Sequence, residues 1–192
     1  MYKRQDKYDL RKIKYDKTSK NWIGPFIMAA INTKIVRRSN ALSGYLYGKD
    51  FEYDEATLGG KGFSGRLKSI LMSIPIAVVM LAKPGSIIKK IVDKILPNAG
   101  EGPSKKDRES GYFNLRFYVT YNDGSRSVAK VTGDMDPGYG STSKMLSESA
   151  VCIAVDKLNG SYGVVTPSTA MGENLLERLK NNSGLTFNIK HL

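Results

Sequence analysis

The stretch "GGKGFSG", Gly59 to Gly65, decides between two fold classes. From Gly60 it has the spacing G-x-G-x-x-G, with which a strand-to-helix turn binds a dinucleotide pyrophosphate. That turn needs a buried strand before it and an acidic residue about 20 residues after it. Here the preceding stretch, Phe51–Leu58, is expected to be a strand but carries three acidic residues, and the next acidic residue is the distant Asp93. The sequence therefore disfavours a parallel nucleotide-binding sheet, and we expect this chain by itself to bind no NAD(P).

The rest of the chain predicts an α+β fold with a mixed or largely antiparallel sheet covered by helices. Apolar residues occupy every second position of Phe113–Tyr121, a turn sequence follows at Asn122–Ser125, and Arg126–Gly133 returns as a paired strand. Pattern and end signals predict helices and strands elsewhere. One expected helix lies within Trp22–Gly44, with Pro25 near its start and Gly44 just past its end. The others are a buried helix over Ser141–Leu158 and an amphipathic helix from Met171 that stops at Gly184, and short strands are expected at Tyr162–Pro167 and Leu185–Ile189.

Composition suggests one ordinary domain in a cytoplasmic protein. We expect residues 1–20 to form a basic arm and residues 21–192 a single domain, with an insert at residues 66–97 and a linker-like stretch at Leu96–Gly111. Met1–Gln5 reads like the translated end of a sequencing transposon, so we expect a truncated reading frame.

The chain has one cysteine and one histidine, which excludes a disulfide framework and a Cys/His metal site. The histidine, His191, is next to the last residue, which argues against a histidine-activated nucleophile.

The net charge of +12 is concentrated in two segments. Residues 1–20 carry eight basic and three acidic residues, and residues 61–97 carry seven basic residues and one acidic residue. The second segment holds the uncharged run Ile70–Ala82, in which Pro75 should kink or end a helix, and then an amphipathic helix capped by Ser86. Candidates for contact with an anionic membrane surface are Lys83, Ile87, Ile88, Lys89, Lys90, Ile91, Lys94 and Ile95.

Two other interpretations of this segment stay open. Both helices can belong to the core, with lysines that are simply solvated, or they can contact a partner subunit. A nucleic-acid partner is disfavoured, because the lysines lie beside aliphatic residues and not beside the aromatic residues that stack on bases.

No strong catalytic motif is present, and the candidate ligand-binding residues are polar groups near helix ends. Asn32, Arg37, Arg38 and Asn40 share one expected helix, where the arginines can pair with a phosphate or carboxylate or can be solvated. The turn-rich stretch "GDMDPGYGSTS" can present backbone N–H groups to an anion, or it can be a capped turn with Tyr139 packed on the core. Ser141, Thr142 and Ser143 are its candidate caps. The further candidates are Asp136, Gly138, Tyr139, Ser141 and Thr166.

Four blocks in order, Pro25–Leu42, Gly100–Ser104, Gly133–Ala150 and Gly163–Leu179, resemble the C-terminal half of saccharopine dehydrogenase-like oxidoreductases. Within that family the resemblance is strongest to the trans-acting enoyl reductase branch. The family motif Gly-Asp-Pro-Gly-Tyr has two extra residues here, and the neighbouring Pro137 favours Asp136 over Asp134 as the family aspartate.

This resemblance implies the substrate side of an NAD(P)-dependent enoyl reductase that acts on a lipid or polyketide-derived substrate. It implies that NAD(P) belongs to an N-terminal Rossmann domain of a longer parent, on which this chain packs, and that the chain alone is inactive. A homodimer is a further expectation. The alternative is a non-catalytic domain, cytoplasmic or peripheral at a membrane, that binds a membrane or a partner protein.

Overall fold

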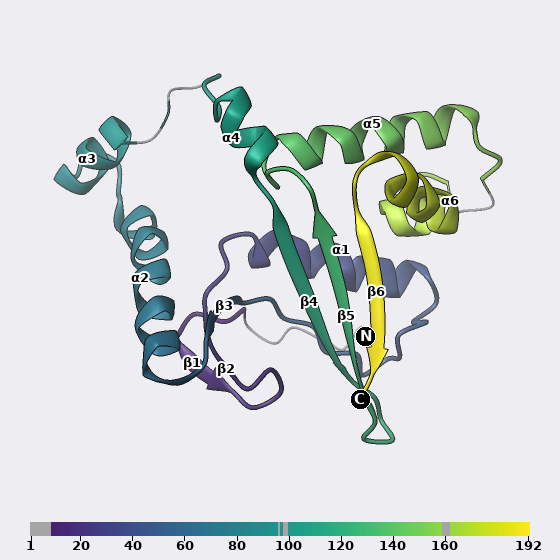
Figure 1. Cartoon of the computed structure of the whole chain (residues 1–192), viewed down its shortest axis with the longest axis horizontal. Helices are drawn as coiled ribbons and strands as arrows, with labels where there is room; N and C mark the ends of the chain where they lie inside the picture. Colours follow the sequence, from purple (N-terminus) through teal and green to yellow (C-terminus); the bar gives the residue numbers. More distant parts are fainter. Residues whose placement is uncertain (1–8, 96, 98–99, 159–161) are drawn as a thin grey trace. The chain divides into compact units, whose positions relative to one another are not determined.

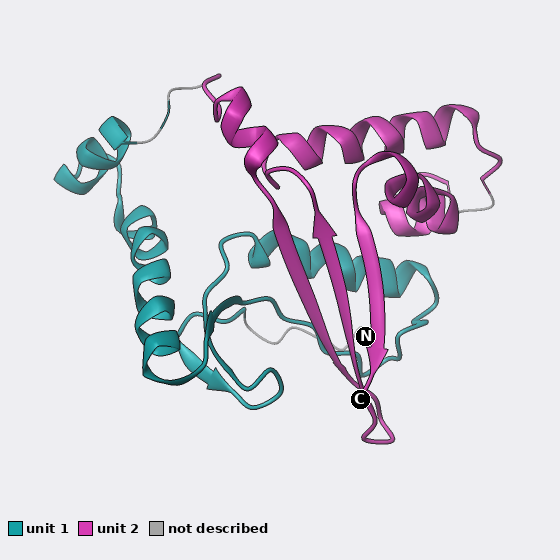
Figure 2. Ribbon diagram, viewed as in Figure 1, with its two compact units in different colours: residues 1–99 teal, residues 100–192 magenta. Residues whose placement is uncertain are grey.

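A computed structural model of the chain describes residues 9–95, 97, 100–158 and 162–192. Figure 1 labels the helices and strands, and Figure 2 shows the two compact units into which the chain divides, residues 1–99 and residues 100–192. Each unit has its own three-stranded antiparallel sheet and three helices, which confirms the α+β class. The boundary lies inside the linker-like stretch 96–111. The single domain over residues 21–192 stays a prediction. Residues 1–5, which we expect to derive from a sequencing transposon, lie outside the described residues.

The first unit is a small sheet with one long helix packed on it. Its strand order is β1-β2-β3, and helix α2 contacts both β2 and β3. Helix α3 contacts α2, and its Val92 is buried. The elements are β1 (Lys14–Asp16), β2 (Asn21–Gly24), α1 (Ala29–Leu42), β3 (Thr57–Gly60), α2 (Gly62–Leu81) and α3 (Ile87–Ile95).

The glycines of "GGKGFSG" allow α2 to lie against β3. A Cβ on Gly65 would collide with the backbone of Gly60, and a Cβ on Gly59 would collide with the side chain of Ser69. Gly60 and Gly62 have φ angles of 112° and 62°, which favour glycine. These glycines therefore have a packing role. The turn differs from that of a nucleotide-binding site, because β3 is the edge strand of an antiparallel sheet and not a central strand of a parallel one.

Three predictions in this unit are correct only in part. Of the two outcomes expected at Pro75, a kink or an end, the structure excludes the end, because α2 continues to Leu81 as one element. The strand expected at Phe51–Leu58 begins only at Thr57, because its charged first half is used in side-chain contacts. The helix expected to start near Pro25 begins at Ala29, and Asn21–Gly24 before it instead pair as a strand with both neighbouring strands.

The second unit is a hairpin extended by a third strand, with two long helices. Strands β4 and β5 pair from Phe113 with Gly133 to Thr120 with Arg126, as the sequence predicts. Gly124, with φ of 84°, lies in the turn between them. The elements are α4 (Lys105–Ser110), β4 (Phe113–Thr120), β5 (Arg126–Gly133), α5 (Gly140–Val155), α6 (Pro167–Asn182) and β6 (Thr186–His191), and the strand order is β4-β5-β6.

Helices α5 and α6 pack on each other through a narrow apolar contact. Cys152 of α5 and Met171 and Leu175 of α6 are buried there, with Leu158, Ala170 and Leu179 around them. The expectation that α5 is a buried helix is wrong, since Leu146, Val151, Ile153 and Val155 are exposed. The short strand expected at Tyr162–Pro167 is also absent from the described residues 162–167, because Thr166 is the N-cap of α6.

Candidate functional site

In the first unit, α1 and the loop after it form a polar network. Asn32 Nδ2 donates to Glu55 Oε2 at 3.0 Å, and the Tyr53 hydroxyl donates to Glu55 Oε1 at 2.9 Å. An Arg37 guanidinium nitrogen donates to the Tyr53 carbonyl oxygen at 3.0 Å. The structure therefore brings the candidates Asn32 and Arg37 together through two residues, Tyr53 and Glu55, that sequence reasoning missed. No motif marks this pair, because its members are polar side chains in an irregular loop.

The Tyr53 hydroxyl keeps its proton and donates a hydrogen bond to the Glu55 side chain. Burial raises the pKa of Tyr53 well above its usual value, and the hydrogen bond and charge of Glu55 raise it further. The hydroxyl is therefore protonated throughout the neutral range. Both side-chain oxygens of Glu55 accept a hydrogen bond from within the unit. This network therefore fixes the loop against α1 and keeps its polar side chains in defined positions.

Asn40 and Arg38 have different surroundings on the same helix. Asn40 is fully buried, and its amide donates to the Gly48 carbonyl at 2.9 Å while its Oδ1 accepts from the Tyr47 N–H at 2.9 Å. It thus fixes the turn that follows α1, which is a structural role. Arg38 lies on the exposed part of α1.

In the second unit, Asp136 closes the turn before α5. Its carboxylate accepts hydrogen bonds from the backbone N–H groups of Gly138, Tyr139 and Gly140, at 3.0, 2.9 and 2.6 Å. These bonds, first that from Gly140, hold the pKa of Asp136 below its usual value. The N–H groups that were candidates for an anion are thus bound by the protein's own carboxylate. The expected serine and threonine caps are wrong, since Ser141, for example, instead donates to the Met135 carbonyl.

The other candidates of this unit lie near helix starts. Tyr139 is 55% exposed and is not part of the buried core, although its ring lies beside Gly102. Thr166 is buried and forms a capping box with Thr169 at the start of α6. Asp134 is separate from Asp136 and pairs with Lys144, with Nζ to Oδ1 at 3.1 Å.

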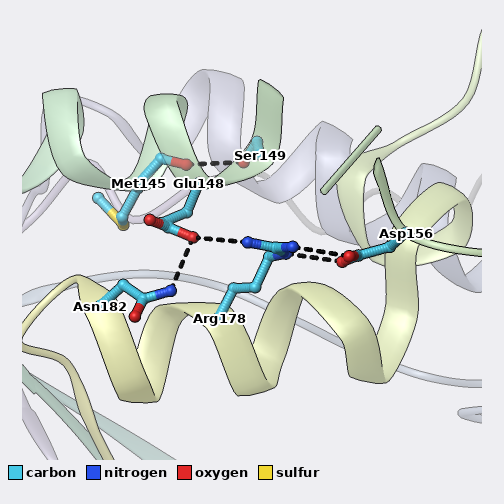
Figure 3. Close-up of polar contacts among 6 residues, drawn as sticks. All are labelled: Met145, Glu148, Ser149, Asp156, Arg178 and Asn182. Atoms are coloured by element: carbon cyan, nitrogen blue, oxygen red, sulfur yellow. Dashed lines mark hydrogen bonds and ion pairs between the residues drawn. The ribbon is translucent and has the colours of Figure 1, made fainter. Parts of the chain in front are cut away.

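Arg178 of α6 is the centre of an ionic network that the sequence does not mark (Figure 3). Its guanidinium donates to both oxygens of Asp156, each at 2.6 Å, and to Glu148 Oε2 at 3.3 Å. Asn182 donates to the same Glu148 oxygen at 3.0 Å. The paired arginine lowers the pKa of Asp156 to about 2. This half-buried cluster joins α5 to α6, and we assign it a structural role.

The insert, residues 66–97, exposes many apolar side chains on α2 and α3. Helix α2 is long and apolar enough to be a candidate membrane span, and only 11% of its most apolar window is buried. Of the isoleucines predicted to contact a membrane, Ile87, Ile88, Ile91 and Ile95 are all exposed on α3. Lys83, Lys90 and Lys94 are exposed beside them, and Lys89 pairs with Asp93. Among the described residues, no group of three or more His, Cys, Asp or Glu side chains can hold a metal ion.

Comparison with known proteins relates the chain to mycobacterial enzymes. A Mycobacterium tuberculosis protein that is provisionally named a trans-acting enoyl reductase is 40% identical over 167 residues. Trans-acting enoyl reductases of Mycobacterium ulcerans and Mycobacterium leprae are 37% and 36% identical over 163 residues. Each match covers 82% of this chain and 39% of the relative.

No protein family profile matches the chain, and no solved structure matches it. The relatives nevertheless share one name and align with the same large share of this chain. The chain is therefore a partial homologue of the trans-acting enoyl reductases, and it spans 39% of their length.

Proposed function

We propose that this chain is the C-terminal, substrate-side portion of an NAD(P)-dependent enoyl reductase. The observation that carries the proposal is identity of 36 to 40%, over most of the chain, to relatives named trans-acting enoyl reductases. An enoyl reductase adds a hydride and a proton across the carbon–carbon double bond of an unsaturated acyl group. Most of each relative lies outside the match, so we place the nicotinamide-binding domain there and expect the chain alone to be inactive.

The proposal extends to family and substrate. The blocks that resemble saccharopine dehydrogenase-like oxidoreductases favour a Rossmann domain as the missing cofactor half. We propose a lipid or polyketide-derived acyl substrate for the parent. The network of Asn32, Arg37, Tyr53 and Glu55 is the candidate substrate-side surface, because it holds charged and hydroxyl groups in fixed positions on α1 and on the loop that follows it.

A chimera tests this function directly. The matched region of the Mycobacterium leprae relative is replaced by this chain, and oxidation of NADH and of NADPH by an enoyl thioester is followed in the absorbance of the nicotinamide. We expect reduction by the chimera and none by the isolated chain. A chimera that melts cooperatively but does not reduce the substrate, beside an active unmodified relative, would contradict the proposal.

A second candidate is a non-catalytic domain that binds a membrane or a partner, with a cytoplasmic or peripheral location. The exposed apolar surface of α2 favours it. The sequence of the genomic DNA upstream of codon six distinguishes the reductase from the non-catalytic domain. An in-frame region that encodes a strand followed by a true glycine fingerprint favours the enzyme, and an in-frame stop codon with a ribosome-binding site favours the stand-alone domain.

A further inference from the structure

The starting observation is the second part of α2, which is mostly apolar and yet is not covered by the rest of the unit. From Ile70 to Leu81, α2 has no charged residue, and none of its residues in this range is buried. Leu71 is 57% exposed, Met80 79% and Leu81 61%. A core helix of this unit would be covered, and a surface helix would carry a polar face. Neither description fits this segment.

The base of the helix is fixed to the sheet, which limits how deep it can reach. Gly65 and Ser69 are buried where α2 crosses β2 and β3, and Arg66 and Lys68 lie in the same two turns. The segment beyond them, Ile70–Leu81, is twelve residues long and therefore about 18 Å. A bilayer core of about 30 Å needs roughly 20 residues, so this segment cannot cross it while its base stays packed.

Helix α3 adds charge to the same surface. A turn at Gly85, which has a φ of 80°, precedes this helix. Its Val92 is buried, while its apolar stripe of Ile87, Ile88, Ile91 and Ile95 stays exposed. Residues 61–97 hold seven basic residues and only Asp93 as an acidic one, and Asp93 is paired with Lys89. An apolar surface bordered by lysines that have no ion-pair partner among the described residues complements an anionic lipid leaflet. Protein interfaces, by contrast, are depleted in lysine.

We propose that α2 beyond Ser69 and α3 together form a one-leaflet anchor that lies in the interface of an anionic membrane. The apolar side chains of Ile70–Leu81 and of the α3 stripe enter the acyl boundary, and Lys83, Lys90 and Lys94 contact the headgroups. The glycine contacts at Gly59 and Gly65 fix the anchor to the sheet. This inference goes beyond the proposed reductase activity and stands without it.

Cosedimentation of the full chain with vesicles tests the anchor. We expect binding to phosphatidylglycerol-containing vesicles at low salt and weaker binding to pure phosphatidylcholine. Because a basic residue near an anionic surface contributes about 1 kcal/mol, the variant Lys83→Gln/Lys90→Gln/Lys94→Gln should bind anionic vesicles about a hundredfold more weakly. Lys89 is kept, because it holds Asp93. Ile88→Ser/Ile91→Ser should weaken binding to both kinds of vesicle.

The matched control removes three exposed cations from the other unit, as Arg116→Gln/Lys130→Gln/Lys190→Gln. It should lose much less than the first triple variant, and a thermal melt checks that every variant is folded. Chain that stays in the supernatant with anionic vesicles, or equal loss in the two triple variants, overturns the anchor. Protein that resists alkaline carbonate extraction would mean a spanning helix. Lipid-free dimerisation that Ile88→Ser/Ile91→Ser abolishes would identify a second copy as the occupant.

Discussion

At the scale of single residues, Gly65 shows how one missing side chain sets the packing of an element. A Cβ at this position would meet the backbone of Gly60, which cannot move aside as a flexible side chain can. Gly65→Ala should therefore lower the free energy of unfolding by about 1–3 kcal/mol, the range for overpacked sites. Urea denaturation measures it. Ser64→Ala, at an exposed position of the same helix, is the control and should change it little; an equal loss in both variants would mean that the close contact is unimportant.

The contact of Asp156 with Arg178 should make the second unit sensitive to acid. In the folded protein the pKa of Asp156 is about 2, below the 3.8 of an unperturbed aspartate. The unfolded state therefore binds its proton first as pH falls, and the stabilisation is complete above about pH 5 and is lost as pH falls toward 2. Thermal melts of the natural chain and Asp156→Asn should differ most at pH 7 and converge near pH 2. A melting difference that is constant over this range would refute the assignment.

At the scale of elements, α2 is a helix that tolerates a proline without ending. Pro75 has no N–H for the helical bond to the Leu71 carbonyl, and this position costs stability in a helix interior. Pro75→Ala should therefore slow amide hydrogen exchange in Ile76–Val79, and Ala77→Gly should speed it, because glycine disfavours helix. Mass spectrometry of the peptide that covers α2 measures the amide exchange rate in both variants. Unchanged exchange in Pro75→Ala would mean that the last turns are not helical in solution.

For the whole molecule, the division into two units predicts where a protease cuts first. The boundary between residues 99 and 100 lies in a stretch rich in glycine, proline and serine, and Lys105 and Lys106 just beyond it are exposed. Brief trypsin treatment should give two resistant fragments that meet between Lys94 and Arg108. Mass spectrometry of the fragments identifies the cut. A first cut inside the β4–β5 hairpin would contradict the division.

A second prediction at this scale concerns the cofactor. The chain alone should bind neither NADH nor NADPH measurably, because the glycines of Gly59–Gly65 are used for packing on an antiparallel edge strand. Fluorescence titration of the nicotinamide measures binding. Micromolar binding that is lost in Gly62→Ala would show that the turn is a nucleotide site after all.

Local patterns were sufficient for part of the fold. The alternation in Phe113–Tyr121 and its turn predict the β4–β5 hairpin, because both depend on neighbouring residues. The same holds for Ser86, whose hydroxyl accepts from the Lys89 N–H at 3.1 Å as the N-cap of α3. The candidate site was only half predictable. Asn32 and Arg37 could be nominated, but Tyr53 and Glu55 reach α1 through a loop of irregular course.

The sequence by itself determined the fold class, the hairpin, the concentration of charge in residues 61–97 and the relationship to enoyl reductases. These follow from composition, local spacing and blocks of similar residues. Only the tertiary structure decided that Asp136 occupies the N–H groups before α5, that "GGKGFSG" is a helix–strand contact and that α2 stays exposed past Pro75. The physical reason is that capping, close backbone contact and burial depend on which atoms meet in space, and spacing along the chain does not fix that.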